Sequence, residues 1–185
     1  IAPQPVMAKS GAEILRLWAA TVDYQEEVRI GPEILARVVE AYRKIRNTCR
    51  YLLANLYDFD PEKDAVPAGQ MFAIDRFALH KLQLLVEKAR RAYDLYEYHT
   101  IYHALYNFCT VDLSAFYLDI LKDRLYTSPA QSVARRSAQT ALHTLVGTLA
   151  RLMAPILPFT AEEIWQHMPA VPGKTASIHL SRLPE

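Results

Sequence analysis

Three arginines and one asparagine lie close together within the segment from Pro32 to Leu56, and their side chains are suited to binding chemistry. They are Arg43, Arg46, Asn47 and Arg50. On a helix that turns by about 100° per residue, these four side chains share one surface. Guanidinium and amide groups donate hydrogen bonds to phosphates and to base edges. The segment therefore predicts a nucleic-acid-binding face; the alternative is an ordinary solvated helix surface.

A second group of basic residues stands near expected helix ends further along the chain. Lys122 and Arg124 precede Tyr126, and Arg135 and Arg136 open the following helix. Basic groups with a tyrosine nearby suit a surface that holds phosphates and stacks an unpaired base. For the second arginine pair, the alternative is a solvated first turn, although cations are slightly unfavourable at a helix N-terminus.

Metal and enzyme sites have little support in the sequence. His99 and His103 are four residues apart, but the chain contains neither HExxH nor a Glu-x-x-His motif. Cys49 and Cys109 belong to no CxxC pair, so we expect two buried thiols and no cysteine zinc site. There is no glycine-rich phosphate loop and no G-x-S-x-G motif. We therefore expect a binding protein rather than a catalytic one.

The composition predicts an all-α fold. The chain has only five glycines in 185 residues and is half hydrophobic, and none of its apolar runs reaches 18 residues. Its net charge of +1 does not indicate nucleic acid, so RNA binding must depend on local patches. We expect an antiparallel helix bundle. The expected helices are 11–20, 32–56, 75–96, about 100–124, about 129–153 and 160–167, with Ser128-Pro129 and Thr160 as helix starts and 177–180 extended.

Six stretches resemble the anticodon-binding region of bacterial-type isoleucyl-tRNA synthetases, which are class I enzymes. They occur in the family's order and cover most of the chain. The stretch at 154–165 is also similar in valyl and related enzymes, whereas RNT at Arg46–Thr48 and KDRLY at Lys122–Tyr126 favour the isoleucyl member. Phe77 stands where the family usually has tryptophan. The stretches are GAEILRLW (11–18), DY (23–24), AYRKIRNTCRYLLANL (41–56), DLSAFYLDILKDRLY (112–126), RRSAQTAL (135–142) and APILPFTAEEIW (154–165).

The resemblance implies a division of the chain. Residues 1–10, which show no hydrophobic periodicity, would be a connector from a missing catalytic domain. Residues 11–168 would form the helical anticodon-binding domain, and residues 169–185 a tail that starts the following region. The family's catalytic signatures HIGH and KMSKS are absent, and Met7–Ser10 only mimics the end of the second. The full-length enzyme would ligate isoleucine to its tRNA using ATP, while this fragment would bind tRNA without catalysis.

The resemblance also implies partners. These are the anticodon stem-loop of tRNA-Ile and the rest of the synthetase chain, in the cytoplasm, with no membrane and no DNA. We expect no cofactor here, because ATP, magnesium and zinc belong to missing parts of the enzyme. The first basic group would contact the loop backbone and base edges. The second group, with Tyr126 beside it, would contact stem phosphates.

Two alternatives remain. The chain could be the equivalent domain of a valyl or leucyl enzyme, which differs only in its cognate tRNA. It could also be a helical bundle for protein contacts without RNA binding, and its exposed face should then carry an apolar patch rather than arginines.

Overall fold

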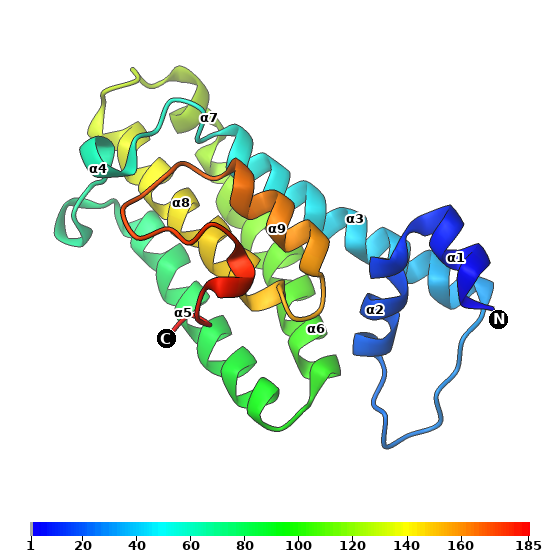
Figure 1. Cartoon of the computed structure of the whole chain (residues 1–185). Coiled ribbons are helices and arrows are strands. Elements are labelled where there is room, and N and C mark those ends of the chain that lie inside the picture. The colour runs from blue at the N-terminus through cyan, green and yellow to red at the C-terminus, as the bar shows by residue number, and fades with distance from the viewer. Residues whose placement is uncertain (1) are drawn as a thin grey trace.

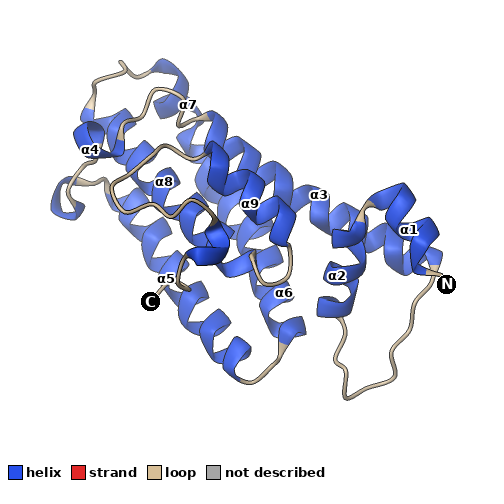
Figure 2. Ribbon diagram, viewed as in Figure 1, coloured by secondary structure: helices blue, strands red, loops and turns tan. Residues whose placement is uncertain are grey.

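The computed structural model describes residues 2–185, and within these residues every regular element is a helix (Figure 2). The predicted all-α class is therefore confirmed. Three helices are long: α3 (Pro32–Ala54), α5 (Ala73–Asp94) and α8 (Val133–Met153). The shorter elements are α1 (Pro3–Ser10), α2 (Ala12–Thr21), α4 (Pro61–Asp64), α6 (Tyr98–Asn107), α7 (Leu118–Thr127), α9 (Pro158–His167) and the 3₁₀ turns η1 (Ala68–Gln70) and η3 (Ile178–Leu180).

Helix α8 lies at the centre of the bundle, where it packs against α3, α5, α7 and α9 (Figure 1). Most of its side chains from Arg135 to Met153 are buried, so it is enclosed on nearly all sides rather than along one stripe. Its many alanines allow the neighbouring helices to approach closely. Gly147 illustrates this packing, because a Cβ built there would stand 2.9 Å from the end of the Met168 side chain.

Helix α3 has the two faces that its sequence predicts. Val38, Ile45, Cys49 and Leu52 are buried in the core, and Tyr42 is partly buried against it. The helix is long enough to join two parts of the molecule, because its start packs against α2 while its later turns pack against α8 (Figure 1). The opposite face of α3 is left in solvent.

The chain from α6 to α7 is one continuous helical rod with an unusual middle. Between them, η2 (Phe108–Tyr117) is a π-helical stretch, and the backbone stays in the right-handed helical region at both of its ends. Asp112 and Ser114 both lie inside this stretch. A π-helical turn is wider than an α-helical one and often occurs at functional sites.

The structure differs from the expected helices at two places. Helix α1 occupies most of the segment predicted to be a connector, where no helix was expected; none of the residues Pro3–Ser10 is buried, which explains why they show no hydrophobic periodicity. Helix α8 begins at Val133 rather than at Pro129. Its cap is Ser132, whose hydroxyl accepts the N–H of Arg135 at 3.3 Å.

The predicted cap of α9 is also wrong, since the helix begins at Pro158 and Thr160 lies within its first turn. The first turn is capped by another helix instead. The Glu13 carboxylate, from α2, accepts the N–H groups of Phe159 and Thr160 at 2.8 and 3.0 Å and also the Thr160 hydroxyl. The segment 177–180, expected to be extended, contains the 3₁₀ turn η3, and Ile178 of this turn is buried.

Candidate nucleic-acid interface

The exposed face of α3 carries the first predicted group intact. Arg43, Arg46, Asn47 and Arg50 are all solvent-exposed and lie on one side of the helix, away from the buried stripe. The stripe fixes the rotation of α3, because turning the helix would place guanidiniums in the core. The helix thus presents three permanent positive charges and one amide from a rigid backbone.

The ion pairs of this face are weak. Arg43 contacts Glu40 on its own helix at 2.7 Å, and Arg46 contacts Glu163 of α9 at 3.4 Å. Both pairs are largely exposed, so water and salt screen them and each contributes less than about 1 kcal/mol. Arg50 has no acidic partner within 4 Å among residues 2–185. These guanidiniums can therefore exchange their present contacts for a phosphate at little cost.

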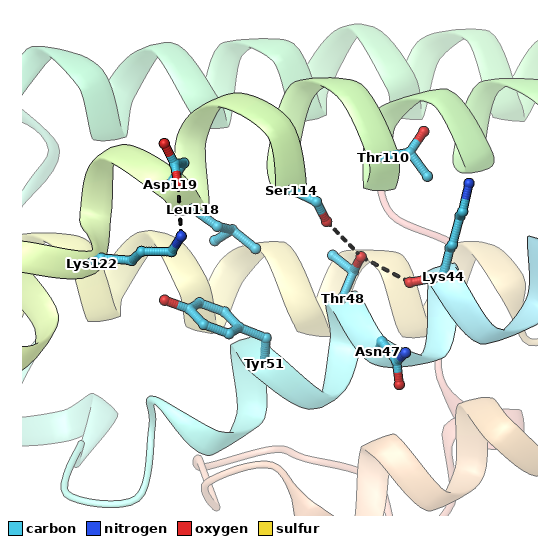
Figure 3. Close-up of a pocket in the computed structure, with 9 residues that line it drawn as sticks. All are labelled: Lys44, Asn47, Thr48, Tyr51, Thr110, Ser114, Leu118, Asp119 and Lys122. Carbon is cyan, nitrogen blue, oxygen red and sulfur yellow. Dashed lines mark hydrogen bonds and ion pairs between the residues drawn. The ribbon is translucent and has the colours of Figure 1, made fainter.

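A groove of about 470 Å³ runs beside this face, between α3 and the rod formed by η2 and α7 (Figure 3). Helix α3 lines it with Lys44, Asn47, Thr48 and Tyr51, and the rod lines it with Thr110, Ser114, Leu118, Asp119 and Lys122. Asn47 belongs both to the arginine-bearing face and to the groove. The groove therefore brings Lys122 of the second predicted group next to the first.

The two lysines stand at opposite ends of the groove (Figure 3). Lys44 donates to the Tyr106 hydroxyl at 3.1 Å, and its Nζ stands 5.6 Å from the centre of that ring. Lys122 donates to Asp119 at 2.7 Å, and this contact raises the pKa of Lys122. The ammonium group of Lys122 is therefore positively charged at neutral pH.

Tyr126 lies beside the Lys122 end of the groove and is 64% exposed. Its hydroxyl is 3.4 Å from the hydroxyl of Tyr51. Burial, the hydrogen bond from Tyr126 and the nearby Asp119 charge raise the pKa of Tyr51. Its ring is therefore neutral and lies within the groove (Figure 3).

Arg124 is not at this surface, in contrast to its predicted role. Its guanidinium forms two hydrogen bonds with the carboxylate of Asp75, at 3.0 and 2.7 Å, and it also donates to the Ala134 carbonyl. Asp75 is completely buried and also accepts from the hydroxyls of Tyr117, at 2.8 Å, and Ser137, at 2.5 Å. A buried carboxylate requires such partners. Arg124 thus joins α7 to α5 and α8 and is unavailable to a stem phosphate.

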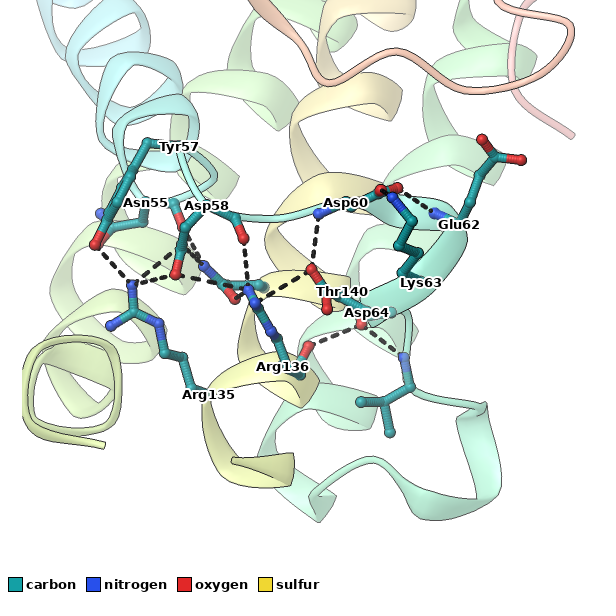
Figure 4. Close-up of polar contacts among 12 residues, drawn as sticks. Asn55, Tyr57, Asp58, Asp60, Glu62, Lys63, Asp64, Arg135, Arg136 and Thr140 are labelled. Carbon is teal, nitrogen blue, oxygen red and sulfur yellow. Dashed lines mark hydrogen bonds and ion pairs between the residues drawn. The ribbon is translucent and has the colours of Figure 1, made fainter. Parts of the chain in front are cut away.

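Arg135 and Arg136 are buried as well, so neither the phosphate prediction nor the solvated-turn alternative describes them. Arg135 donates to both carboxylate oxygens of Asp58, at 3.1 and 3.0 Å (Figure 4). Arg136 donates to the Asp58 carbonyl at 2.8 Å and pairs with Asp64 at 3.2 Å. Gln139 also donates to Asp58, at 2.7 Å. These contacts hold the loop after α3 against the start of α8.

The charge state of Asp58 follows from this network. Burial opposes its ionisation, but the hydrogen bonds from Gln139 and Arg135 and the two arginine charges outweigh burial, so the pKa of Asp58 is lowered. The carboxylate is therefore ionised at neutral pH and holds both guanidiniums.

The groove contains residues that the sequence reasoning missed, namely Lys44, Thr48, Tyr51 and Ser114. Two of these residues could have been found from the sequence. Lys44 and Tyr51 are three residues before and four residues after Asn47, so all three lie on one side of a helix. Ser114 had no such signal, since its direction depends on the π-helical stretch.

An exposed apolar patch lies on the outer side of α5 and the rod. Phe77 and Phe116 pack edge to face with ring centres 6.3 Å apart, and Ile120 lies on the same rod. All three are between 45% and 49% exposed. This is the feature that the protein-contact alternative predicts, and it coexists with the exposed arginines.

The described residues give two further findings. No group of three or more His, Cys, Asp or Glu within residues 2–185 is arranged to hold a metal ion. No helix in the described part of the chain combines the length and hydropathy of a transmembrane span.

Comparison with known proteins points to one family. The family described as the anticodon-binding domain of tRNA ligase matches residues 75–185. Over all 185 residues the chain is 52% identical to the isoleucine–tRNA ligase of Moorella thermoacetica, 55% to that of Geobacter sulfurreducens and 52% to that of Geobacillus kaustophilus. In each case the match covers 100% of this chain and 20% of the relative, so the chain spans about a fifth of the length of these relatives.

Proposed function

Because the chain belongs to the family of anticodon-binding domains of tRNA ligases, we propose that it binds the anticodon stem-loop of tRNA-Ile through the exposed face of α3. The observation that supports this most strongly is the exposure of Arg43, Arg46 and Arg50 on one rigid helix. Unstacked loop bases offer their edges and faces to a protein, and the loop backbone offers phosphates. Lys122 and Tyr126 extend the surface onto α7.

We further propose that the whole protein is a cytoplasmic isoleucine–tRNA ligase that uses ATP. The relatives carry that name over about five times the length of this chain. In such an enzyme these residues hold the tRNA, and the chemistry takes place in other parts of the chain. Correct docking of the anticodon then positions the acceptor end at a distance.

The test is binding of the 185-residue chain to a fluorescent anticodon stem-loop of tRNA-Ile, followed by anisotropy at several salt concentrations. We expect affinity to fall as salt rises, because each bound phosphate releases counterions. The double substitution Arg46→Gln/Arg50→Gln should weaken binding at least tenfold. It should also flatten the salt dependence, by roughly one unit of slope for each phosphate that is no longer bound. Arg91→Gln, an exposed arginine of α5, is the matched control and should change neither quantity.

Equal binding by the double variant and the wild-type chain would refute the α3 face as the RNA site. Competition with stem-loops of valine and leucine tRNAs tests the cognate partner: the isoleucine stem-loop should compete best.

A second role is favoured by the patch of Phe77, Phe116 and Ile120. Four fifths of the length of the relatives lies outside this chain, and the patch suits a contact with that remaining part of a synthetase. An apolar contact of this kind depends little on salt, in contrast to the RNA contact. Phe116→Ser should therefore leave stem-loop binding unchanged; a loss of binding in a folded variant would contradict the separation of the two surfaces.

A further inference from the structure

The floor of the groove between α3 and the η2–α7 rod is formed by hydroxyl groups. Their hydrogens already take part in hydrogen bonds within the protein. Thr48 lies within hydrogen-bond distance of the Lys44 carbonyl, at 3.0 Å, and of the Ser114 hydroxyl, at 3.0 Å. A carbonyl can only accept, whereas Ser114 can donate. Both contacts are satisfied when Thr48 donates to the carbonyl and Ser114 donates to Thr48 (Figure 3).

The hydroxyl hydrogen of Thr110 is also used within the protein, because this hydroxyl donates to the Tyr106 carbonyl at 2.8 Å. A hydroxyl has one hydrogen and two lone pairs. With that hydrogen used inside the protein, Thr110 and Ser114 offer the groove only acceptors. A ligand that lies on this floor forms hydrogen bonds where it presents N–H groups, and it forms none where it presents carbonyl oxygens.

The walls and ends of the groove suit a nucleotide. The neutral ring of Tyr51 supplies a stacking face. The ammonium groups of Lys44 and of Lys122, which is paired with Asp119, stand at the two ends, where phosphates can lie. Its volume of about 470 Å³ is near the small end of ligand pockets, which suits a single nucleoside rather than a larger ligand. Asn47, shared with the arginine face, can both donate to and accept from a base edge.

Building on the proposed function, we propose that this groove receives one unstacked base of the anticodon loop and selects a base that points an exocyclic amino group at Ser114. Adenine, cytosine and guanine carry such a group, and uracil does not. The arginine face then holds the backbone, while the groove next to it reads one base through the acceptor of Ser114 and the ring of Tyr51.

The test pairs a substitution in the protein with the removal of one amino group from the RNA. Stem-loops are made in which a single loop adenosine, cytidine or guanosine is replaced by purine riboside, zebularine or inosine, each of which lacks only the amino group. Ser114→Ala removes the acceptor. Thr144→Ala is the matched control, because Thr144 is an exposed hydroxyl on α8 that also donates to its own helix.

We expect one loop position at which loss of the amino group weakens binding to the wild-type chain about fivefold, the effect of one hydrogen bond. Ser114→Ala should weaken binding of the normal stem-loop by a similar factor, and loss of the amino group should then have no further effect. Tyr51→Leu should weaken binding by about tenfold, because the base no longer stacks on an aromatic ring. Thr144→Ala should retain the full response to amino-group removal.

The outcomes distinguish failure of the groove inference from failure of the proposed function. If the stem-loop binds through the arginines, but no amino group matters or the effect of its removal persists undiminished in Ser114→Ala, the groove inference is wrong and the proposed function stands. If binding does not depend on the arginines, the proposed role of the α3 face is wrong, and the groove inference is decided separately by whether Ser114→Ala abolishes the effect of amino-group removal.

Discussion

The molecule contains two sets of arginines that are alike in sequence and opposite in surroundings. Arg43, Arg46 and Arg50 extend from α3 into solvent, where their acidic contacts are screened by water or absent. Arg124, Arg135 and Arg136 lie mostly inside the bundle, against Asp75 and Asp58. The comparison shows that the neighbours of an arginine in space, rather than along the chain, decide whether it is left available to a ligand or holds the fold.

The deciding acids come from distant parts of the sequence. Asp75 is 49 residues from Arg124, and Asp58 is 77 residues from Arg135. The free energies differ accordingly, because a buried charge that loses its partner is left desolvated, whereas an exposed one is rehydrated. Substitutions of the acidic partners should therefore lower the free energy of unfolding much more for the buried arginines than for the exposed ones.

The largest effect is expected for Asp75→Asn. The substitution keeps the shape of the side chain but leaves the Arg124 guanidinium without its charge partner in a largely buried position. We expect the free energy of unfolding to fall by about 3 kcal/mol. Urea unfolding followed by circular dichroism measures it, and a change below about 1 kcal/mol would show that this network contributes little to the fold.

Asp58→Asn should have a smaller effect, about 2 kcal/mol at neutral pH, and that effect should depend on pH. The pKa of Asp58 is lowered in the folded chain, so its carboxylate adds stability above the unfolded-state pKa of about 4 and loses it as pH falls through the folded-state pKa. The difference in unfolding free energy between wild type and variant should therefore shrink below about pH 4. A difference that stays constant with pH would contradict an ionised Asp58.

The smallest effect is expected for Glu40→Gln, which removes the exposed partner of Arg43. Unfolding free energy should change by less than about 0.5 kcal/mol. Stem-loop affinity should rise slightly, because one negative charge leaves the proposed RNA face. A twofold loss of affinity in the same anisotropy assay would count against RNA contact at this end of α3.

Much of the fold could be predicted from local patterns. The buried stripe of α3 and the exposure of its arginines followed from helical periodicity alone, because that helix is amphipathic, with one face in the core and one in solvent. Helix ends were harder to predict. Ser128-Pro129 has the chemistry of a helix start, but the cap is formed four residues later by Ser132. The start of α9 is capped from α2 by Glu13, and no local pattern contains that contact.

The candidate site could be predicted only in part for the same reason. A sequence shows that Arg135 and Arg136 are charged, but their burial in α8 depends on two distant acids, Asp58 in the loop after α3 and Asp64 in α4. The groove depends on a π-helical stretch that turns Ser114 toward Thr48. No repeating pattern of residues in the sequence indicates either of these arrangements.

One paired measurement tests the central claim that exposed arginines bind RNA while buried ones hold the fold. Arg50→Gln and Arg136→Gln are each assayed for stem-loop affinity and for unfolding free energy at the same pH and salt. Arg50→Gln should weaken binding about fivefold or more with unfolding free energy unchanged within about 0.5 kcal/mol. Arg136→Gln should lower unfolding free energy by about 2 kcal/mol or more, while the fraction that remains folded binds RNA as the wild-type chain does. The reverse pattern, with RNA binding lost at Arg136 and retained at Arg50, would contradict the account.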